Sequence, residues 1–142
     1  MTTGGHQHGG PELPALDTYM YGREGRTDPA LIAAAVGADF AECTSCRDRR
    51  LDDIAADPMM TSHLVALAYQ AMVSYKVDIP AATTLAQKYF HTTAAMLLAL
   101  STSDFPAALL FAENASVHSR RRAAGEALKV WTDLMRSGQP IG

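Results

Sequence analysis

Apolar residues recur every three or four positions along most of the chain, the spacing that places side chains on one face of an α-helix. The clearest stripe consists of Met60, Leu64, Leu67, Ala68, Ala71 and Tyr75. A second stripe, from about Pro80 to Leu100, contains Leu85, Tyr89, Met96 and Leu100. We find no stretch with the alternating period of a β-strand. The pattern therefore predicts an all-α fold.

Capping residues and prolines divide this pattern into segments. Asp28 and Pro29 predict a helix start, because the carboxylate can accept from free amides and proline suits the first helical position. Asp57-Pro58 predicts the end of the segment before it, and the next main helix can start either there or at Thr61-Ser62. The last segment, Phe105 to Arg136, would be about 48 Å long as one helix, so we expect a bend near residues 114–116 or at Gly125. Four or five helices are expected.

The length of 142 residues suits one domain. We predict a single-domain helical bundle over residues 27–142. Residues 1–26 lack a helical period and are rich in glycine, so we expect a flexible tail to about Gly10 and then an extended apolar arm docked in a groove.

The composition is that of a globular protein, with 48% hydrophobic residues and a net charge of −3. This charge argues against bulk binding to nucleic acid. No basic and apolar leader is visible at the N-terminus, and no apolar run reaches the roughly 20 residues that span a bilayer. We therefore expect a cytoplasmic protein with no membrane partner.

Cys43 and Cys46 are the main candidates for chemistry, because residues three apart on a helix lie one turn apart on the same face. In a reducing compartment this spacing is more typical of a metal or redox site than of a structural disulfide. Zinc would need two further ligands, for which His63 and His118 are the best-placed histidines. One alternative is a redox pair activated by the arginines that follow Cys46. The other is a purely structural role, in which Cys43 packs as a small hydrophobic residue and Cys46 is half-exposed.

Two arginine clusters, at residues 47–50 and 120–122, suggest an anion site if their helices are adjacent. The candidate anion-binding residues are Arg47, Arg50 and Arg121. Consecutive arginines fan around a helix, however, and nearby aspartates offer ion-pair partners, so a solvated surface is the alternative.

Residues 103–115 resemble the turn and second helix of a tetratricopeptide unit, through Asp104-Phe105, Ala108 and Ala115. This resemblance covers one helical hairpin and implies only that two antiparallel helices pack closely through alanines.

The function we expect from these features is that of a small cytosolic binding or regulatory module rather than an enzyme. Its partner would be a protein or a small-molecule ligand, its cofactor would be zinc if any, and such bundles often form homo-oligomers. The alternative is a thiol-disulfide redox protein or sensor that uses Cys43 and Cys46.

Overall fold

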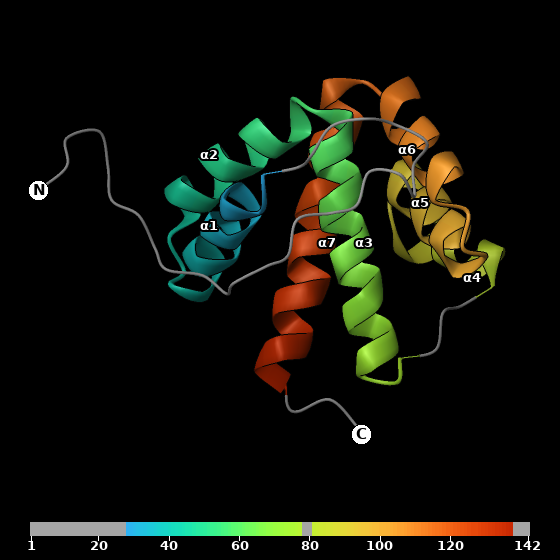
Figure 1. Ribbon diagram of the computed structural model, residues 1–142. Helices are drawn as coiled ribbons and strands as arrows, with labels where there is room; N and C mark the ends of the chain where they lie inside the picture. The colour runs from blue at the N-terminus through green and yellow to red at the C-terminus, as the bar shows by residue number, and fades with distance from the viewer. Residues whose placement is uncertain (1–27, 78–80, 138–142) are drawn as a thin grey trace, which may run out of the picture.

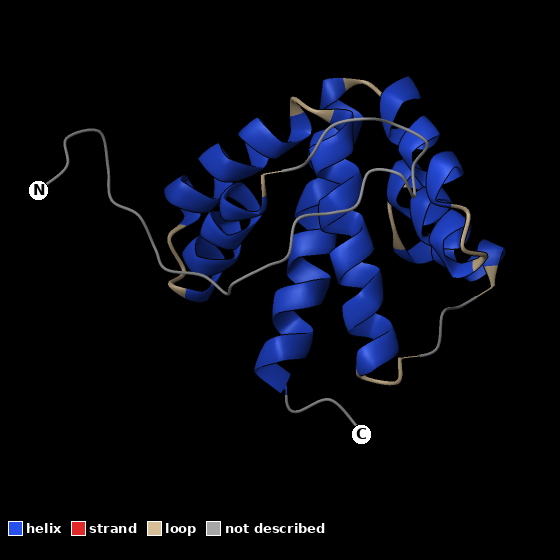
Figure 2. Cartoon of the chain, in the orientation of Figure 1, coloured by secondary structure: helices blue, strands red, loops and turns tan. Residues whose placement is uncertain are grey.

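The computed structural model describes residues 28–77 and 81–137, and all regular structure in these ranges is helical (Figure 2). The predicted all-α class is therefore confirmed. The predicted N-terminal tail and arm lie outside the described residues. The helices are α1 (Pro29–Phe40), α2 (Thr44–Ala55), α3 (Pro58–Ser74), α4 (Ala82–Lys88), α5 (His91–Ser101), α6 (Phe105–Asn114) and α7 (Val117–Ser137).

The predicted helix start at Asp28-Pro29 is confirmed, and of the two starts considered for the next main helix the structure has Asp57-Pro58. The side chain of Asp28 accepts a hydrogen bond from the Ala30 amide at the start of α1. The side chain of Asp57 accepts one from the Met59 amide at the start of α3, at 2.9 Å. In both helices proline occupies the first position, where its missing N–H leaves no hydrogen bond unmade.

The predicted helix count was too low, since the described residues form seven helices rather than four or five. The segment expected to be one helix up to Leu100 is divided into α4 and α5, because Tyr89 adopts an extended conformation. Glu126 of α7 stabilises this break: its carboxylate accepts from the Phe90 amide at 3.0 Å and from the Thr93 hydroxyl at 2.6 Å. This cap comes from a distant helix and leaves no local sequence signal.

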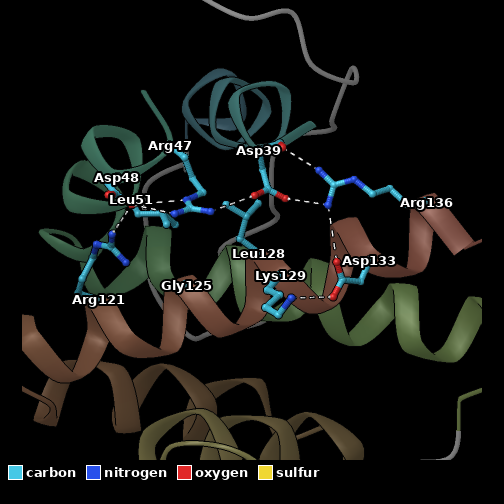
Figure 3. A pocket seen from close by; sticks show the side chains of 10 residues that line it. All are labelled: Asp39, Arg47, Asp48, Leu51, Arg121, Gly125, Leu128, Lys129, Asp133 and Arg136. Atoms are coloured by element: carbon cyan, nitrogen blue, oxygen red, sulfur yellow. Dashed lines mark hydrogen bonds and ion pairs between the residues drawn. The ribbon is translucent and has the colours of Figure 1, made fainter. Parts of the chain in front are cut away.

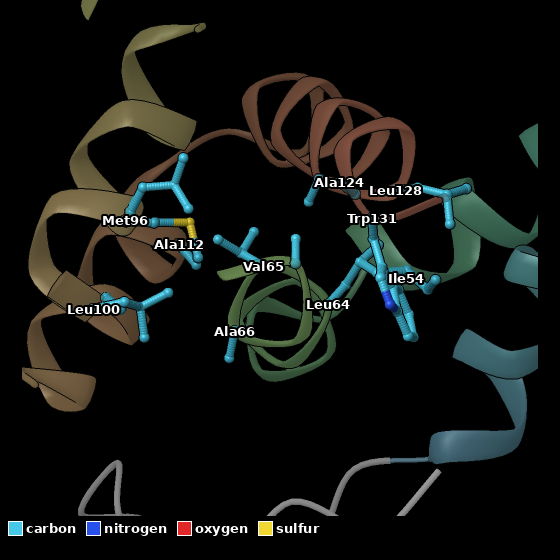
Figure 4. Packing of buried hydrophobic residues seen from close by; sticks show 14 of the residues in the cluster. Ile54, Leu64, Val65, Ala66, Met96, Leu100, Ala112, Ala124, Leu128 and Trp131 are labelled. Atoms are coloured by element: carbon cyan, nitrogen blue, oxygen red, sulfur yellow. The ribbon is translucent and has the colours of Figure 1, made fainter. Parts of the chain in front are cut away.

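The helix α3 packs most extensively against α7, and this pair forms the centre of the molecule. Figure 1 shows α1 and α2 on one side of the pair and α4, α5 and α6 on the other. The hydrophobic core follows the same arrangement (Figure 4). Leu64 of α3 lies toward Ile54 and Trp131, whereas Val65 lies toward Met96 on the opposite side. Helix α3 therefore contributes to the packing on both sides of the pair.

Arg120 links three helices from a buried position on α7. Its Nε donates to the carbonyl of Ala55 at 2.7 Å, at the end of α2. Its Nη1 donates to the carbonyls of Ala115 at 2.8 Å and Ala112 at 3.3 Å, at the end of α6. The last carbonyls of a helix have no partner within the helix. Arg120 therefore satisfies groups at two helix ends and holds α2 and α6 against α7.

The α5–α6 hairpin matches what the tetratricopeptide resemblance implied about packing. The two helices are in close contact, and Ala108 and Ala112 of α6 are fully buried. The break that ends α6 lies at residues 115–116, one of the two positions expected for a bend, whereas Gly125 lies inside the continuous helix α7.

Candidate functional site

The cysteine pair lies at the turn between α1 and α2. Glu42 adopts a left-handed conformation with φ of 57°, and the Cys43 amide donates to the Ala38 carbonyl at 2.9 Å. This is the hydrogen-bond pattern of a Schellman turn, which ends a helix and redirects the chain. The turn makes Cys43 the N-cap residue of α2 and places Cys46 in the first turn of that helix.

The two thiols have different environments. Cys46 is buried, whereas Cys43 is only half-buried, and neither forms a disulfide. A hydrogen bond with Cys43 raises the pKa of the Cys46 thiol, and burial raises it further, while Arg49 opposes both effects. The Nη2 atom of Arg49 lies 3.8 Å from the Cys46 sulfur. The raised pKa disfavours the thiolate of Cys46, and Cys43 is the more accessible thiol.

The predicted histidine ligands are not assembled with the cysteines. His63 is buried on α3, where burial lowers its pKa to about 4, and its Nδ1 has no hydrogen-bond partner among the described residues. His118 is exposed on α7. Over residues 28–77 and 81–137, no three His, Cys, Asp or Glu side chains form a group that could hold a metal ion. Of the four predicted zinc ligands, the structure brings together Cys43 and Cys46. A four-ligand zinc site there would need two further ligands.

A second candidate site is a pocket of about 280 Å³ between α1, α2 and α7, which we call the charged pocket (Figure 3). Four cationic and three carboxylate side chains line it, together with two leucines and one glycine. The lining residues are Asp39, Arg47, Asp48, Leu51, Arg121, Gly125, Leu128, Lys129, Asp133 and Arg136.

The seven charged side chains form one continuous chain of alternating sign. Its order is Arg121, Asp48, Arg47, Asp39, Arg136, Asp133 and Lys129. The successive nitrogen–oxygen distances are 3.1, 3.4, 3.4, 3.5, 3.6 and 3.2 Å. A cation stands at each end, so the lining carries one more positive than negative charge in a protein whose net charge is −3.

Asp39 is the best-satisfied carboxylate of the charged pocket, with a side chain only 13% exposed. The hydroxyl of Thr132 donates to its Oδ2 at 2.5 Å, and Arg47 and Arg136 flank it. Arg136 is also held by the backbone, because its Nη2 donates to the Asp39 carbonyl at 2.7 Å. These contacts hold Thr132 and Arg136 of α7 against the C-terminal end of α1.

The α7 side of the charged pocket depends on a small residue. Gly125 lies one turn after Arg121, and a Cβ atom at this position would lie 3.2 Å from the Arg121 Nη1. That separation is closer than an ordinary van der Waals contact. The absence of a side chain therefore leaves space for the guanidinium of Arg121 to turn toward α2, where it contacts Asp48 and Asp52.

The structure places two of the three predicted anion-binding residues in the charged pocket. Arg47 and Arg121 line it from different helices, whereas Arg50 is not among its lining residues. The neighbours of Arg121 point elsewhere, since Arg120 is buried and Arg122 lies over the Phe90 ring at 4.4 Å. The fan that we expected for consecutive arginines is therefore present on α7.

Five charged residues of the charged pocket were not predicted as site residues: Asp39, Asp48, Lys129, Asp133 and Arg136. A signal for the α7 members was present in the sequence. Arg121, Gly125, Lys129 and Asp133 are spaced by four, which places them along one face of a long helix. Asp39 had no comparable signal, because its role depends on how α1 packs beside α7.

Comparison with known proteins does not assign the chain. No protein-family model matches it, and neither a curated protein nor a solved structure shows significant similarity to it. Among the described helices, none combines the length and the apolar character needed to cross a membrane.

Proposed function

We propose that this protein is a small helical binding module and that the charged pocket holds a charged small-molecule ligand. The observation that carries the proposal is the convergence of three helices on a 280 Å³ space lined by seven charged side chains. This volume lies near the lower end of the range for small-molecule sites, about 300–1,000 Å³, so a compact ligand is expected.

The loose geometry of the ion pairs supports the proposal. All three hydrogen bonds of Arg47 to carboxylates are 3.4 Å long, compared with about 2.9 Å for a typical N–H···O bond. The Arg47 side chain is also 36% exposed. Its guanidinium therefore retains donors that a ligand could engage at shorter distance, at a small cost in lost intramolecular contacts.

Isothermal titration calorimetry at low ionic strength would test the proposal. The probes are inorganic phosphate, succinate and putrescine, which supply an oxyanion, a dicarboxylate and a dication. The decisive variant is Arg47→Ala. Its matched control is Arg50→Ala, which removes the same charge from the same helix outside the charged pocket.

We expect at least one probe to bind the wild-type protein, or the Asp48→Asn variant, in which the carboxylate that contacts Arg47 and Arg121 is removed. Arg47→Ala should weaken that binding about tenfold, the cost of one charge-assisted hydrogen bond. Arg50→Ala should change the affinity less than about twofold, the size of a screened surface-charge effect. Equal losses in both variants would mean that the binding is not at the charged pocket.

A second candidate function is thiol-disulfide exchange at Cys43 and Cys46, and the asymmetry of the two thiols favours it. Cys43 would attack a substrate disulfide, displace one thiol and form a mixed disulfide. Cys46 would then attack the Cys43 sulfur and release the second thiol. The protein would lose two protons and two electrons, which the substrate disulfide gains as two thiols.

Alkylation with iodoacetamide, followed by peptide mass spectrometry, would test this second candidate. Cys43 should react faster than Cys46 in the native protein, and Cys43→Ser should abolish the fast phase while Cys46→Ser keeps it. Slow alkylation of both thiols in the native, metal-free protein would contradict the redox function. Native mass spectrometry before and after chelation would detect zinc held by the same thiols.

A further inference from the structure

The side chain of Asp48 occupies the position where two arginines from different helices converge. Its Oδ1 accepts from the Arg121 Nη2 at 3.1 Å and from the Arg47 Nε and Nη2 at 3.4 Å. Figure 3 shows this carboxylate between the two guanidinium groups, at the edge of the charged pocket. The location of Oδ1 therefore marks where an anionic oxygen is stabilised by both helices.

Asp48 is less firmly held than the other carboxylate that contacts Arg47. Its side chain is 47% exposed, whereas that of Asp39 is 13% exposed. Asp39 also accepts the short hydrogen bond from Thr132. A rotation of Asp48 into solvent would leave the donors of Arg47 and Arg121 directed at the space that it vacates, while Asp39 stays in place.

We infer that Asp48 is a built-in competitor for the ligand of the charged pocket, and that this ligand presents a carboxylate or phosphate oxygen to Arg47 and Arg121. The inference rests on the proposed binding function and specifies its ligand class. The ligand oxygen takes the position of the Asp48 Oδ1, and Asp48 turns outward to water. Both guanidinium groups then bind the incoming anion.

The charges of the charged pocket favour an anion over a cation. When Asp48 leaves, Arg47 keeps its contact with Asp39 and Arg121 keeps its contact with Asp52. A cation at the position that Asp48 vacates would still meet two like charges, those of Arg47 and Arg121. Lys129 adds a third positive group, and its side chain is 78% exposed. An anionic ligand instead restores the alternating order of charges that the pocket has without ligand.

The test compares Asp48→Asn with Asp53→Asn. Asp53 lies on the same helix, is exposed and does not line the charged pocket, so it controls for the loss of one negative charge. Calorimetric titrations with inorganic phosphate and with succinate, at low ionic strength and without competing anions, distinguish the two oxyanion sources.

We expect Asp48→Asn to bind one of the two anions about tenfold more tightly than the wild-type protein, because it removes a competing charge-assisted contact. Asp53→Asn should tighten binding less than about twofold. The Asp48→Asn, Arg121→Ala double variant should lose the gain. Asp48→Ala should behave like Asp48→Asn, which excludes an effect specific to the asparagine amide.

Other outcomes separate this inference from the proposed function. Equal gains in Asp48→Asn and Asp53→Asn, or anion binding that Asp48→Asn leaves unchanged, would overturn the competitor role while the binding function stands. Binding of putrescine alone, sensitive to Asp39→Asn, would overturn the anion class and also leave the binding function intact. Failure of all three probes to bind the wild-type protein and the Asp48 variants would overturn both proposals.

Discussion

The two sides of the α3–α7 pair are built in different ways. On the α4–α6 side, apolar residues such as Met96, Leu100 and Ala108 are almost completely buried, and the cavity there measures only about 10 Å³. On the α1–α2 side, Leu51 and Ile54 of α2 are equally buried, but a 280 Å³ pocket with a charged lining remains beside them.

This difference suggests that the apolar contacts on the α4–α6 side mainly stabilise the fold, whereas the charged pocket on the α1–α2 side is suited to binding. Apolar groups are stabilised most when water and empty space are excluded, and the small cavity between α3, α5 and α7 leaves little interior space for a ligand. Partly exposed ion pairs contribute little to folding, and they can be exchanged for contacts with a ligand at low cost. The α1–α2 side can therefore carry a binding site without weakening the core.

The largest expected effect is the difference in free energy of unfolding between a core substitution and a substitution in the charged pocket. Leu100, on the α4–α6 side, is 2% exposed, and Leu100→Ala should lower the free energy of unfolding by about 3 kcal/mol through lost burial and a new cavity. Arg47→Ala should lower it by less than about 1 kcal/mol, because its ion pairs are long and partly exposed. Urea unfolding followed by circular dichroism measures both. Equal losses would mean that the charged pocket is part of what stabilises the fold.

Arg120 and Arg122 lie two positions apart on α7. Substituting each of them tests whether α7 joins the two sides through buried polar contacts. Arg120→Ala removes the donors that Ala55, Ala112 and Ala115 use, and should lower the free energy of unfolding by about 2–3 kcal/mol. Arg122→Ala removes an exposed contact with the Phe90 ring and should cost about 0.5–1 kcal/mol. A small effect at Arg120 would contradict its role in connecting α2 and α6.

The pH dependence of stability tests whether the two sides unfold together, because His63 lies on α3, the helix that both sides share. Its pKa is about 4 in the folded protein, whereas its ordinary value is 6.5. As the pH falls, the unfolded chain therefore binds a proton before the folded protein does. The free energy of unfolding should be unaffected by this group above pH 6.5 and fall as the pH drops toward 4, by about 2 kcal/mol at pH 5.

Urea titrations at pH 7.5 and pH 5 measure this loss. His63→Gln should reduce the pH dependence, and His91→Gln, at an exposed position on α5, should retain it. Circular dichroism and the fluorescence of Trp131 should report the same transition. A pH dependence that is unchanged in His63→Gln would exclude His63 as its source.

Much of the helical structure could be predicted from local residues. Asp28-Pro29 and Asp57-Pro58 begin helices as expected, because their capping hydrogen bonds involve only neighbouring backbone amides. The break between α4 and α5 could not be predicted in the same way, since the carboxylate that caps α5 belongs to Glu126, 36 positions away from Phe90.

The same distinction applies to the candidate sites. The sequence predicted that Cys43 and Cys46 would be close, because residues three apart on a helix must be close. The expectation that Cys43 packs in the core while Cys46 is half-exposed was wrong, because Cys46 is the buried thiol and Cys43 is half-buried. Which thiol is buried depends on the turn at Glu42 and on packing around α2. The role of His63 also depended on packing. The structure buries its side chain on α3, and within residues 28–77 and 81–137 no three metal-binding side chains come together.

The sequence by itself determined the all-α class, the start of α1 and the spacing that keeps one face of α7 polar, because these depend on periodicity and on contacts within a few residues. Only the tertiary structure decided that Arg47 and Arg121 converge on Asp48 and that Asp39 joins them. Those contacts link residues 73 and 93 positions apart, as between Asp48 and Arg121 and between Asp39 and Thr132. Their geometry depends on how α1, α2 and α7 pack against one another, which no local pattern specifies.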